Sequence, residues 1–166
     1  MNPAYFITGT DTDVGKTTVA AGFLYAARAA GLSTAAGKPV ASGCEVTPQG
    51  LRNADALALM AESSIRLSYD EVNPVASEPA IAPHIAAREA GVVLTVRSLL
   101  GPMQHILSKQ ADFTLIEGAG GWRVLPLNSR RAGRYCRRWP AWRVSSTTGW
   151  PWASRRAWMA PMRPPS

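Results

Sequence analysis

The first 127 residues alternate between strand-like and helix-like spacings of apolar positions. A short apolar β-forming run covers residues 4–8, and residues 19–30 carry strong helix formers that end at Gly31. Residues 32–40 alternate as a second strand does. A strand, a helix and a strand in this order predict a right-handed crossover, so the two strands should be parallel but not necessarily adjacent.

Two further helices are predicted from apolar periodicity. Residues 51–62 favour a helix after a turn at 47–50, and residues 95–110 favour an amphipathic helix. The expected apolar face of the first holds Leu51, Ala54, Leu57, Ala58 and Ala61. The second should turn inward Leu99, Leu100, Met103, Ile106 and Leu107, with Met103 as core filling.

Between and after these helices the pattern changes twice. Residues 72–84 contain three prolines and cannot be one regular element, so we expect an extended excursion in which His84 caps or packs. Residues 113–116 form the continuous apolar run of a buried parallel strand, and a glycine-rich turn should begin at Glu117. The whole pattern predicts an α/β fold with a mostly parallel sheet.

Charge divides the chain at about residue 127. Residues 1–127 hold nine basic and all eleven acidic side chains, a net charge of −2, whereas residues 128–166 hold nine arginines and no acid, a net charge of +9. The positive total therefore belongs to a tail and does not indicate a nucleic-acid partner for the body. Cys44 and Cys136 lack the spacing of a disulfide framework or a zinc site. With no leader and no apolar run of membrane-spanning length, we expect a cytoplasmic protein without a membrane partner.

Candidate chemistry begins in the loop between the first strand and the first helix. Gly9 and Gly15 bound five residues and are followed by Lys16 and Thr17, the order of a phosphate-binding loop, although the usual gap is four residues. Backbone N–H groups and the positive helix end would surround an anion there. Lys16 would reach the β- and γ-phosphates and the Thr17 hydroxyl would ligate Mg²⁺. A P-loop NTPase-like three-layer fold is therefore expected.

Three more polar side chains are expected near that loop. Lys38 and Glu117 follow predicted parallel strands, and ligands bind at the carboxyl edge of such sheets. Lys38 is either a ligand contact or a solvated strand end, and Glu117 is either a metal ligand or an acidic cap. Asp55 lies beside the apolar stripe of its helix. The pattern does not decide whether it is a Mg²⁺ ligand or a residue on the polar margin of the helix. Ser42 adds a hydroxyl in a small-residue loop facing the same region.

Together these blocks resemble the dethiobiotin synthetase family over residues 5 to about 127. The blocks that carry the resemblance are, in chain order, 8–17, 38–43, 51–57, 72–74, 83–85 and 117–122. The resemblance implies ATP- and Mg²⁺-dependent carboxylation and ring closure of 7,8-diaminononanoate with CO2, which gives dethiobiotin. It also implies a homodimer. The family's adenine-holding residues and partner-contributed contacts have no counterpart in the matching region.

The resemblance also implies roles for individual residues. Lys38 and Lys16 would be catalytic, flanking the γ-phosphate and the carbamate, while Thr12 and Ser42 would bind substrate. Mg²⁺ would be held by Thr17, Asp55 and Glu117. ATP would contact Asp13, Val14, Gly15, Lys16, Thr17, Thr18, Asp55, Glu117, Gly118, Ala119 and Gly120.

The tail, residues 128–166, departs from the family and from any helix or strand period. It contains nine Arg, five Trp and five Pro but no Leu, Ile, Phe, Asp, Glu or Lys. A disordered basic arm that binds nucleic acid and a lineage-specific extension are two interpretations. We favour a third, a GC-rich coding sequence translated in the wrong frame. The fold should then be C-terminally incomplete, and the strand at residues 113–116 should be only partly covered. The family's activity would belong to the ancestor of this chain more than to the chain as written.

Two functions of other classes stay open. Another P-loop ATPase or an amide-forming synthetase would share the loop but lack the 38–43 block. A nucleic-acid binder would act through the tail, and a salt-sensitive shift of labelled DNA would indicate it.

Overall fold

The computed structural model describes residues 2–91, 93–121 and 157–161. Its helices are α1 (Lys16–Ala29), α2 (Ala54–Ala61), α3 (Tyr69–Val72), α4 (Pro83–Glu89) and α5 (Val96–Ser108). Its strands are β1 (Ala4–Gly9), β2 (Thr34–Gly37), β3 (Val40–Ala41), β4 (Glu45–Thr47), β5 (Gly50–Arg52), β6 (Val75–Ala76), β7 (Phe113–Gly121) and β8 (Ala157–Pro161). Among the described residues, no helix combines the length and the apolar character needed to cross a membrane.

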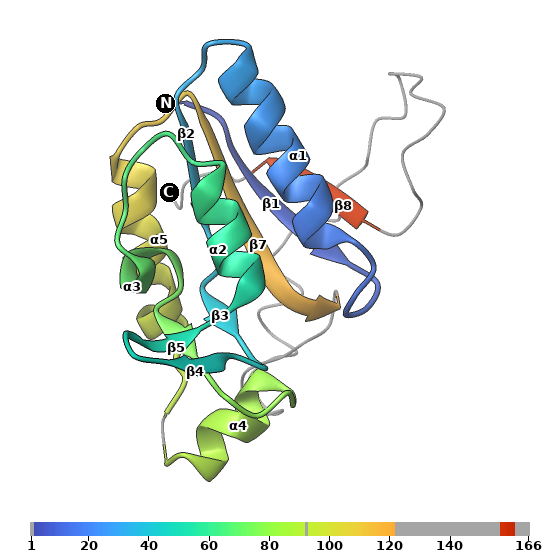
Figure 1. Cartoon of the computed structure of the whole chain (residues 1–166), viewed down its shortest axis with the longest axis vertical. Coiled ribbons are helices and arrows are strands. Elements are labelled where there is room, and N and C mark those ends of the chain that lie inside the picture. Colours follow the sequence, from blue (N-terminus) through green and yellow to red (C-terminus); the bar gives the residue numbers. More distant parts are fainter. Residues whose placement is uncertain (1, 92, 122–156, 162–166) are drawn as a thin grey trace.

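The main sheet has the order β2-β7-β1-β8 (Figure 1). β7 is parallel to β1 and to β2, whereas β8 is antiparallel to β1. The first two strands of the chain are therefore parallel and separated by β7, as the crossover pattern predicts. The sheet is mostly parallel, and its carboxyl ends bring β1, β2 and β7 to one edge.

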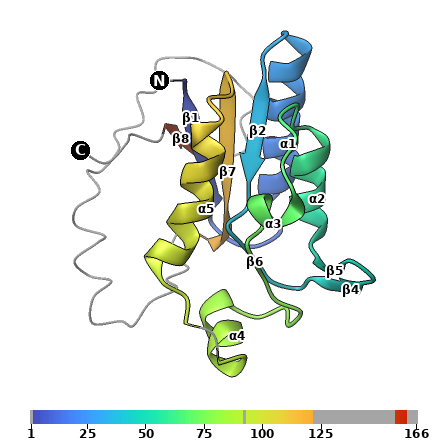
Figure 2. The ribbon, with the colours of Figure 1, turned by 90° about the vertical axis from the view of Figure 1, so that its left-hand side faces the viewer.

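Helices cover both faces of this sheet, which makes three layers (Figure 2). Neighbouring residues of β7 point to opposite faces. Leu115 packs with Leu24 of α1 and Leu59 of α2, whereas Ile116 packs with Met103 and Ile106 of α5. This layering confirms the predicted α/β, P-loop NTPase-like class.

The strand β7 corrects two expectations. It continues through Gly121, because the residues expected to form a glycine-rich turn still pair with β1 up to the contact of Gly9 with Gly121. It is also central rather than partly open. Leu115 and Ile116 are almost completely buried, since β1, β2 and helices on both faces enclose them.

The helix α2 begins later than predicted and buries a different face. Residues 50–52 form β5 of a hairpin with β4, and Asn53 caps the helix. Ala56 and Leu59 are buried, whereas Leu57 is exposed, so the predicted face is wrong. The segment is apolar at most positions, and its periodicity therefore leaves the buried face ambiguous.

The remaining predictions hold in outline. The strand predicted over 32–40 is interrupted, with β2 and β3 on either side of Lys38. The helix predicted over 95–110 is α5, capped by Thr95, although Leu100 is exposed. The proline-rich segment is irregular and contains β6. The helix α4 was not predicted, and His84 is exposed on this helix.

One part of the tail is described. Residues 157–161 form β8 along the outer edge of β1. This strand was not predicted, because the tail shows no strand periodicity. The predictions for the rest of the tail, residues 128–156 and 162–166, and for Cys136 lie outside the described residues.

Candidate active site

The loop between β1 and α1 is shaped by two glycines. A Cβ on Gly9 would lie 2.6 Å from the Cγ2 of Val14, too close for any other residue without movement of that side chain. Gly15 has a φ of 87°, in the left-handed region that glycine adopts without strain. It precedes Lys16, the first residue of α1, so the free N–H groups of the helix begin where the loop ends.

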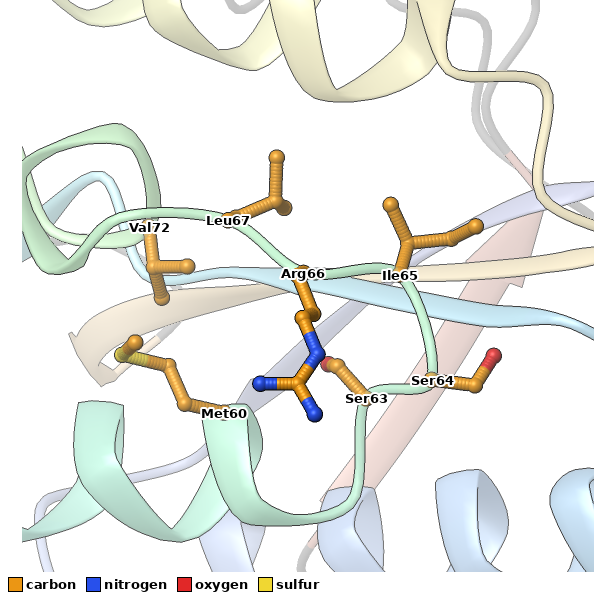
Figure 3. Close-up of a pocket in the computed structure, with 7 residues that line it drawn as sticks. All are labelled: Met60, Ser63, Ser64, Ile65, Arg66, Leu67 and Val72. Carbon is orange, nitrogen blue, oxygen red and sulfur yellow. The ribbon is translucent and has the colours of Figure 1, made fainter.

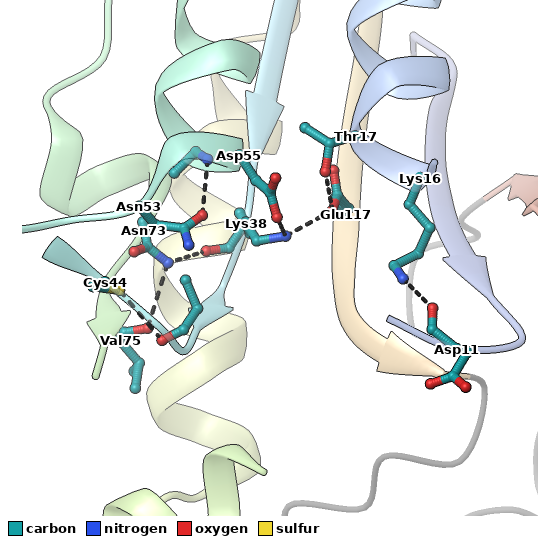
Figure 4. Close-up of polar contacts among 12 residues, drawn as sticks. Asp11, Lys16, Thr17, Lys38, Cys44, Asn53, Asp55, Asn73, Val75 and Glu117 are labelled. Atoms are coloured by element: carbon teal, nitrogen blue, oxygen red, sulfur yellow. Dashed lines mark hydrogen bonds and ion pairs between the residues drawn. The ribbon is translucent and has the colours of Figure 1, made fainter. Parts of the chain in front are cut away.

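The side chain of Lys16 folds back over this loop. Its Nζ donates a hydrogen bond to the backbone oxygen of Asp11 at 2.5 Å, as Figure 4 shows. The ammonium is largely buried, although Thr12 and Asp13 beside it are exposed. Lys16 therefore has one polar contact within the described residues, and that contact is to a backbone carbonyl of the loop itself.

Lys38 enters the same region from the end of β2. Its Nζ lies 2.6 Å from Oε1 of Glu117 and 3.0 Å from Oδ2 of Asp55 (Figure 4). Lys38 is 4% exposed and Glu117 is completely buried, whereas the Asp55 side chain is 46% exposed. One buried ammonium thus joins an interior carboxylate to a carboxylate at the surface.

Glu117 connects the two sides of the site. Its Oε1 accepts hydrogen bonds from the Thr17 hydroxyl at 2.9 Å and from Lys38. Its Oε2 is buried and has no hydrogen-bond partner among the described residues. A buried carboxylate oxygen without a partner is costly, which points to a ligand at this position.

These side chains surround a pocket of about 260 Å³ at the carboxyl ends of the parallel strands. Among the described residues, three carboxylates and two ammonium groups belong to its lining. Its lining consists of Thr12, Asp13, Gly15, Lys16, Thr17, Thr18, Lys38, Asp55, Glu117 and Gly120. Most residues predicted to bind nucleotide or substrate are therefore together, and Lys38 faces the phosphate loop as expected.

Four predicted site residues do not line this pocket. Val14 is half-buried in the loop, and Gly118 and Ala119 belong to β7. Ser42 is half-buried just after β3. The roles of these four residues stay predictions, as do the roles of the residues that line the pocket.

A larger cavity of about 450 Å³ lies elsewhere, beside the loop between α2 and α3 (Figure 3). Ile65 and Leu67 point from this loop toward α5, while Arg66 points toward α2. The hydroxyls of Ser63 and Ser64 contact the backbone oxygens of Leu59 and Thr34. Because the described residues that line this cavity include neither the phosphate loop nor a carboxylate, the smaller pocket is the candidate site.

The predicted metal ligands Thr17, Asp55 and Glu117 all line the smaller pocket. In the described part of the chain, no group of three His, Cys, Asp or Glu side chains could hold a metal. The predicted set contains two carboxylates and one hydroxyl, all hard oxygen ligands of the kind Mg²⁺ binds. Together with the unpartnered oxygen of Glu117, this donor set fits the ion.

Three buried side chains next to the site were not predicted. Asn73 donates from Nδ2 to the backbone oxygen of Lys38, and the Tyr69 hydroxyl donates to Asn73. The same hydroxyl accepts from the backbone N–H of Asn53, the residue that caps α2. Asn53 and Asn73 lie in the sequence blocks 51–57 and 72–74 that carry the family resemblance, but the sequence does not identify their hydrogen-bond partners.

The comparisons with known proteins agree with this geometry. A family model described as an AAA domain matches residues 3–132. Proteins named ATP-dependent dethiobiotin synthetase BioD match the same part of the chain. The relative from Pseudomonas paraeruginosa is 67% identical over 128 residues, which are 77% of this chain and 56% of that protein. Those from Cellvibrio japonicus and Marinobacter nauticus are 62% and 57% identical, over 75% and 76% of this chain and 54% and 53% of their own lengths.

The chain spans about half the length of the curated relatives it matches. Within that span the predicted resemblance to dethiobiotin synthetases is confirmed. A phosphate loop, a lysine at the end of β2 and a carboxylate in β7 meet at one sheet edge, and all three lie within residues 3–132, which the family model matches. The chain belongs to the AAA domain family.

Proposed function

We propose that this chain performs the ATP- and Mg²⁺-dependent carboxylation and ring closure of 7,8-diaminononanoate with CO2, giving dethiobiotin, ADP and phosphate. The names of the relatives support the class of reaction. The observation that carries the proposal is the pair of lysines: Lys16 and Lys38 come from different elements and line one pocket. A second ammonium beside a phosphate loop suits a reaction in which two anions must meet.

The proposed reaction balances without a covalent enzyme intermediate. One amine of the substrate attacks CO2 and loses a proton, which gives a carbamate. A carbamate oxygen attacks the γ-phosphorus, the bond to the β-phosphate oxygen breaks, and ADP leaves. The second amine then attacks the carbamate carbon, the C–O bond to phosphate breaks, and this nitrogen loses a proton as the ring forms.

In this scheme the two lysine ammonium groups stabilise the negative charge of the reactants. Both are largely buried, where an ammonium stabilises an anion more strongly than it does in water. Lys16 would exchange its bond to the Asp11 carbonyl for the phosphates. Lys38 would hold the carbamate against the γ-phosphate while Glu117 and Asp55 keep its ammonium at the pocket wall.

The remaining polar groups would bind and orient the reactants. Thr17, Asp55 and Glu117 would hold Mg²⁺, which when bound offsets phosphate charge. Thr12 and Ser42 would bind the carbamate or the amine. The phosphates would lie along the backbone of residues 13–18, with residues 117–120 on the other side. A homodimer and a cytoplasmic location complete the proposal and rest on the family resemblance and the sequence.

The test is incorporation of labelled bicarbonate by the purified chain. We expect an acid-stable ureido product that requires ATP, the diamine and Mg²⁺ together. Reactions without the diamine serve as the control for ATP hydrolysis alone. Binding of ATP without formation of this product would refute the assignment and leave a nucleotide-binding domain.

A further inference from the structure

We infer that Tyr69, Asn73 and Asn53 are positioning residues that hold the backbone of Lys38 and the helix bearing Asp55 in a fixed relation. The meaning of this arrangement for catalysis rests on the proposed function. The geometric part concerns only how one ammonium is kept between two carboxylates, and it can be tested without turnover.

The first connection holds the main chain of Lys38. Its backbone oxygen accepts a hydrogen bond from Nδ2 of Asn73 at 2.6 Å, and its N–H donates to the backbone oxygen of Val72 at 2.8 Å. Lys38 lies between β2 and β3, where the main sheet no longer supplies hydrogen bonds. The segment at the end of α3 therefore replaces a neighbouring strand at this residue (Figure 4).

The second connection runs from Asn73 to α2. The Tyr69 hydroxyl donates to Oδ1 of Asn73 at 3.0 Å and accepts from the N–H of Asn53 at 2.7 Å. Oδ1 of Asn53 in turn accepts from the N–H of Ala56 at 3.1 Å, which caps α2. Two residues beyond the cap, Asp55 returns to the Nζ of Lys38 at 3.0 Å, so the path closes on the residue where it began.

The residues that form this ring of contacts are buried. Tyr69, Asn53 and Asn73 are 9%, 8% and 2% exposed, so the polar atoms that form this path have little access to water and depend on one another as partners. The Tyr69 ring is held from outside by the guanidinium of Arg52, 4.2 Å from its centroid. Burial also raises the pKa of Tyr69, which keeps its hydroxyl protonated and able to donate to Asn73.

The consequence is that a single hydroxyl aligns two separate chain segments. If it is removed, Asn73 loses a donor and Asn53 an acceptor, and only the ion pair of Lys38 with Asp55 still joins the Lys38 segment to the start of α2. The Lys38 ammonium should then leave its carboxylates more often. Lys16 lines the same pocket but contacts none of these residues, so it reports whether an effect is local.

The experiment compares Tyr69→Phe with the parent chain by acylating lysines with acetic anhydride and measuring the rates at Lys38 and Lys16 by mass spectrometry. We expect the ratio of the Lys38 rate to the Lys16 rate to rise at least about fivefold, because fivefold is the scale of one lost hydrogen bond and the variant loses two. Tyr25→Phe is the matched control, because Tyr25 is exposed on α1 and its hydroxyl makes no hydrogen bond to the described residues.

A second variant tests the same path at its other end. Asn73→Asp keeps the acceptor for the Tyr69 hydroxyl and removes the donor to the Lys38 carbonyl, so the ratio should also rise. An unchanged ratio in both variants, or an equal rise at both lysines, overturns the inference, since the latter indicates general loosening. A parent chain that forms no dethiobiotin would refute the proposed function and leave this labelling result intact.

Discussion

Lys16 and Lys38 line one pocket, but the chain holds them by contacts of different range. The bond of Lys16 joins residues five apart, within a single loop. Lys38 is bonded to Glu117, 79 residues away, and through its backbone to Asn73, 35 residues away. The loop side of the site is therefore built locally, whereas the Lys38 side depends on the packing of β2, α2, α3 and β7.

This difference indicates how each lysine would meet a nucleotide. Lys16 bonds to one neutral carbonyl of an exposed loop, so an arriving phosphate can replace that partner at little cost. Lys38 is already paired with Glu117 in the interior and with Asp55 at the surface. We therefore expect the loop side to adapt to its ligand, whereas the Lys38 side would already be in place before a ligand binds.

The largest effect is expected from Lys38→Ala. Ring closure should fall by about 10²–10³-fold, the scale of losing one electrostatic group in a preorganised site, because the carbamate would lose its cation. ATP binding should weaken far less than turnover, since the loop and Lys16 remain and only one contact to the γ-phosphate would be lost. Radiolabel incorporation and equilibrium nucleotide binding measure the two quantities, with Lys109→Ala at the exposed end of α5 as control. Retained turnover would remove Lys38 from the mechanism.

Glu117→Gln should show how strongly the Lys38 side depends on packing. The change leaves a buried ammonium without its nearest anion, and breaking such a pair costs about 3–5 kcal/mol of unfolding free energy. Urea unfolding measures this loss. Asp13→Asn, an exposed acid of the loop side, is the matched control. If both variants lose the same small amount, the two sides do not differ as described.

Gly9→Ala tests the loop side directly. The new Cβ would lie 2.6 Å from the Cγ2 of Val14, and forcing extra volume into a packed position costs about 1–3 kcal/mol. Gly22→Ala is the control, because an added Cβ there meets nothing within 4 Å on α1 and should stabilise by about 0.5–1 kcal/mol. Thermal unfolding compares them, and equal midpoints would contradict the close approach at Gly9.

The smallest effect should come from Asp112, at the opposite end of the sheet from both lysines. Its carboxylate accepts from the hydroxyl and the N–H of Ser33, and these hydrogen bonds hold its pKa below the ordinary value. The folded state therefore favours the ionised form. Its contribution to stability is complete above about pH 4 and is lost as the pH falls through the lowered pKa.

In Asp112→Asn, the free energy of unfolding should therefore fall slightly less steeply as the pH is lowered into the acid range. Near neutral pH, its slope against pH should stay almost unchanged. Unfolding midpoints measured from about pH 2 to 6 provide the curve. Asp70→Asn is the control, as the Asp70 carboxylate is exposed and has no hydrogen-bond partner among the described residues. An acid limb identical to that of the parent chain would contradict the assigned role.

The same division between local and distant contacts explains what the sequence predicted. Gly15, Lys16 and Thr17 are recognisable because loop and helix start are adjacent in the chain. The proximity of Lys38 and Glu117 could be predicted because the carboxyl ends of parallel strands lie at one edge of the sheet. This rule of topology requires no side-chain detail.

Features that depend on packing could not be predicted in this way. The buried face of α2 was assigned wrongly because apolar residues occupy most of its positions. The length of β7 was missed because Gly118 and Gly120 suggest a turn, although pairing with β1 continues beyond them. Tyr69 and Asn73 became recognisable only through their partners, which lie far from one another in the sequence.

Convergence of the two ammonium groups on the end of a triphosphate can be measured in a crystal structure of the chain with Mg²⁺ and a non-hydrolysable ATP analogue. We expect the Nζ atoms of Lys16 and Lys38 each within about 3 Å of a γ-phosphate oxygen, a normal hydrogen-bond distance. A γ-phosphate bound by Lys16 alone, with Lys38 still joined only to Glu117 and Asp55, would contradict the proposed carboxylase chemistry.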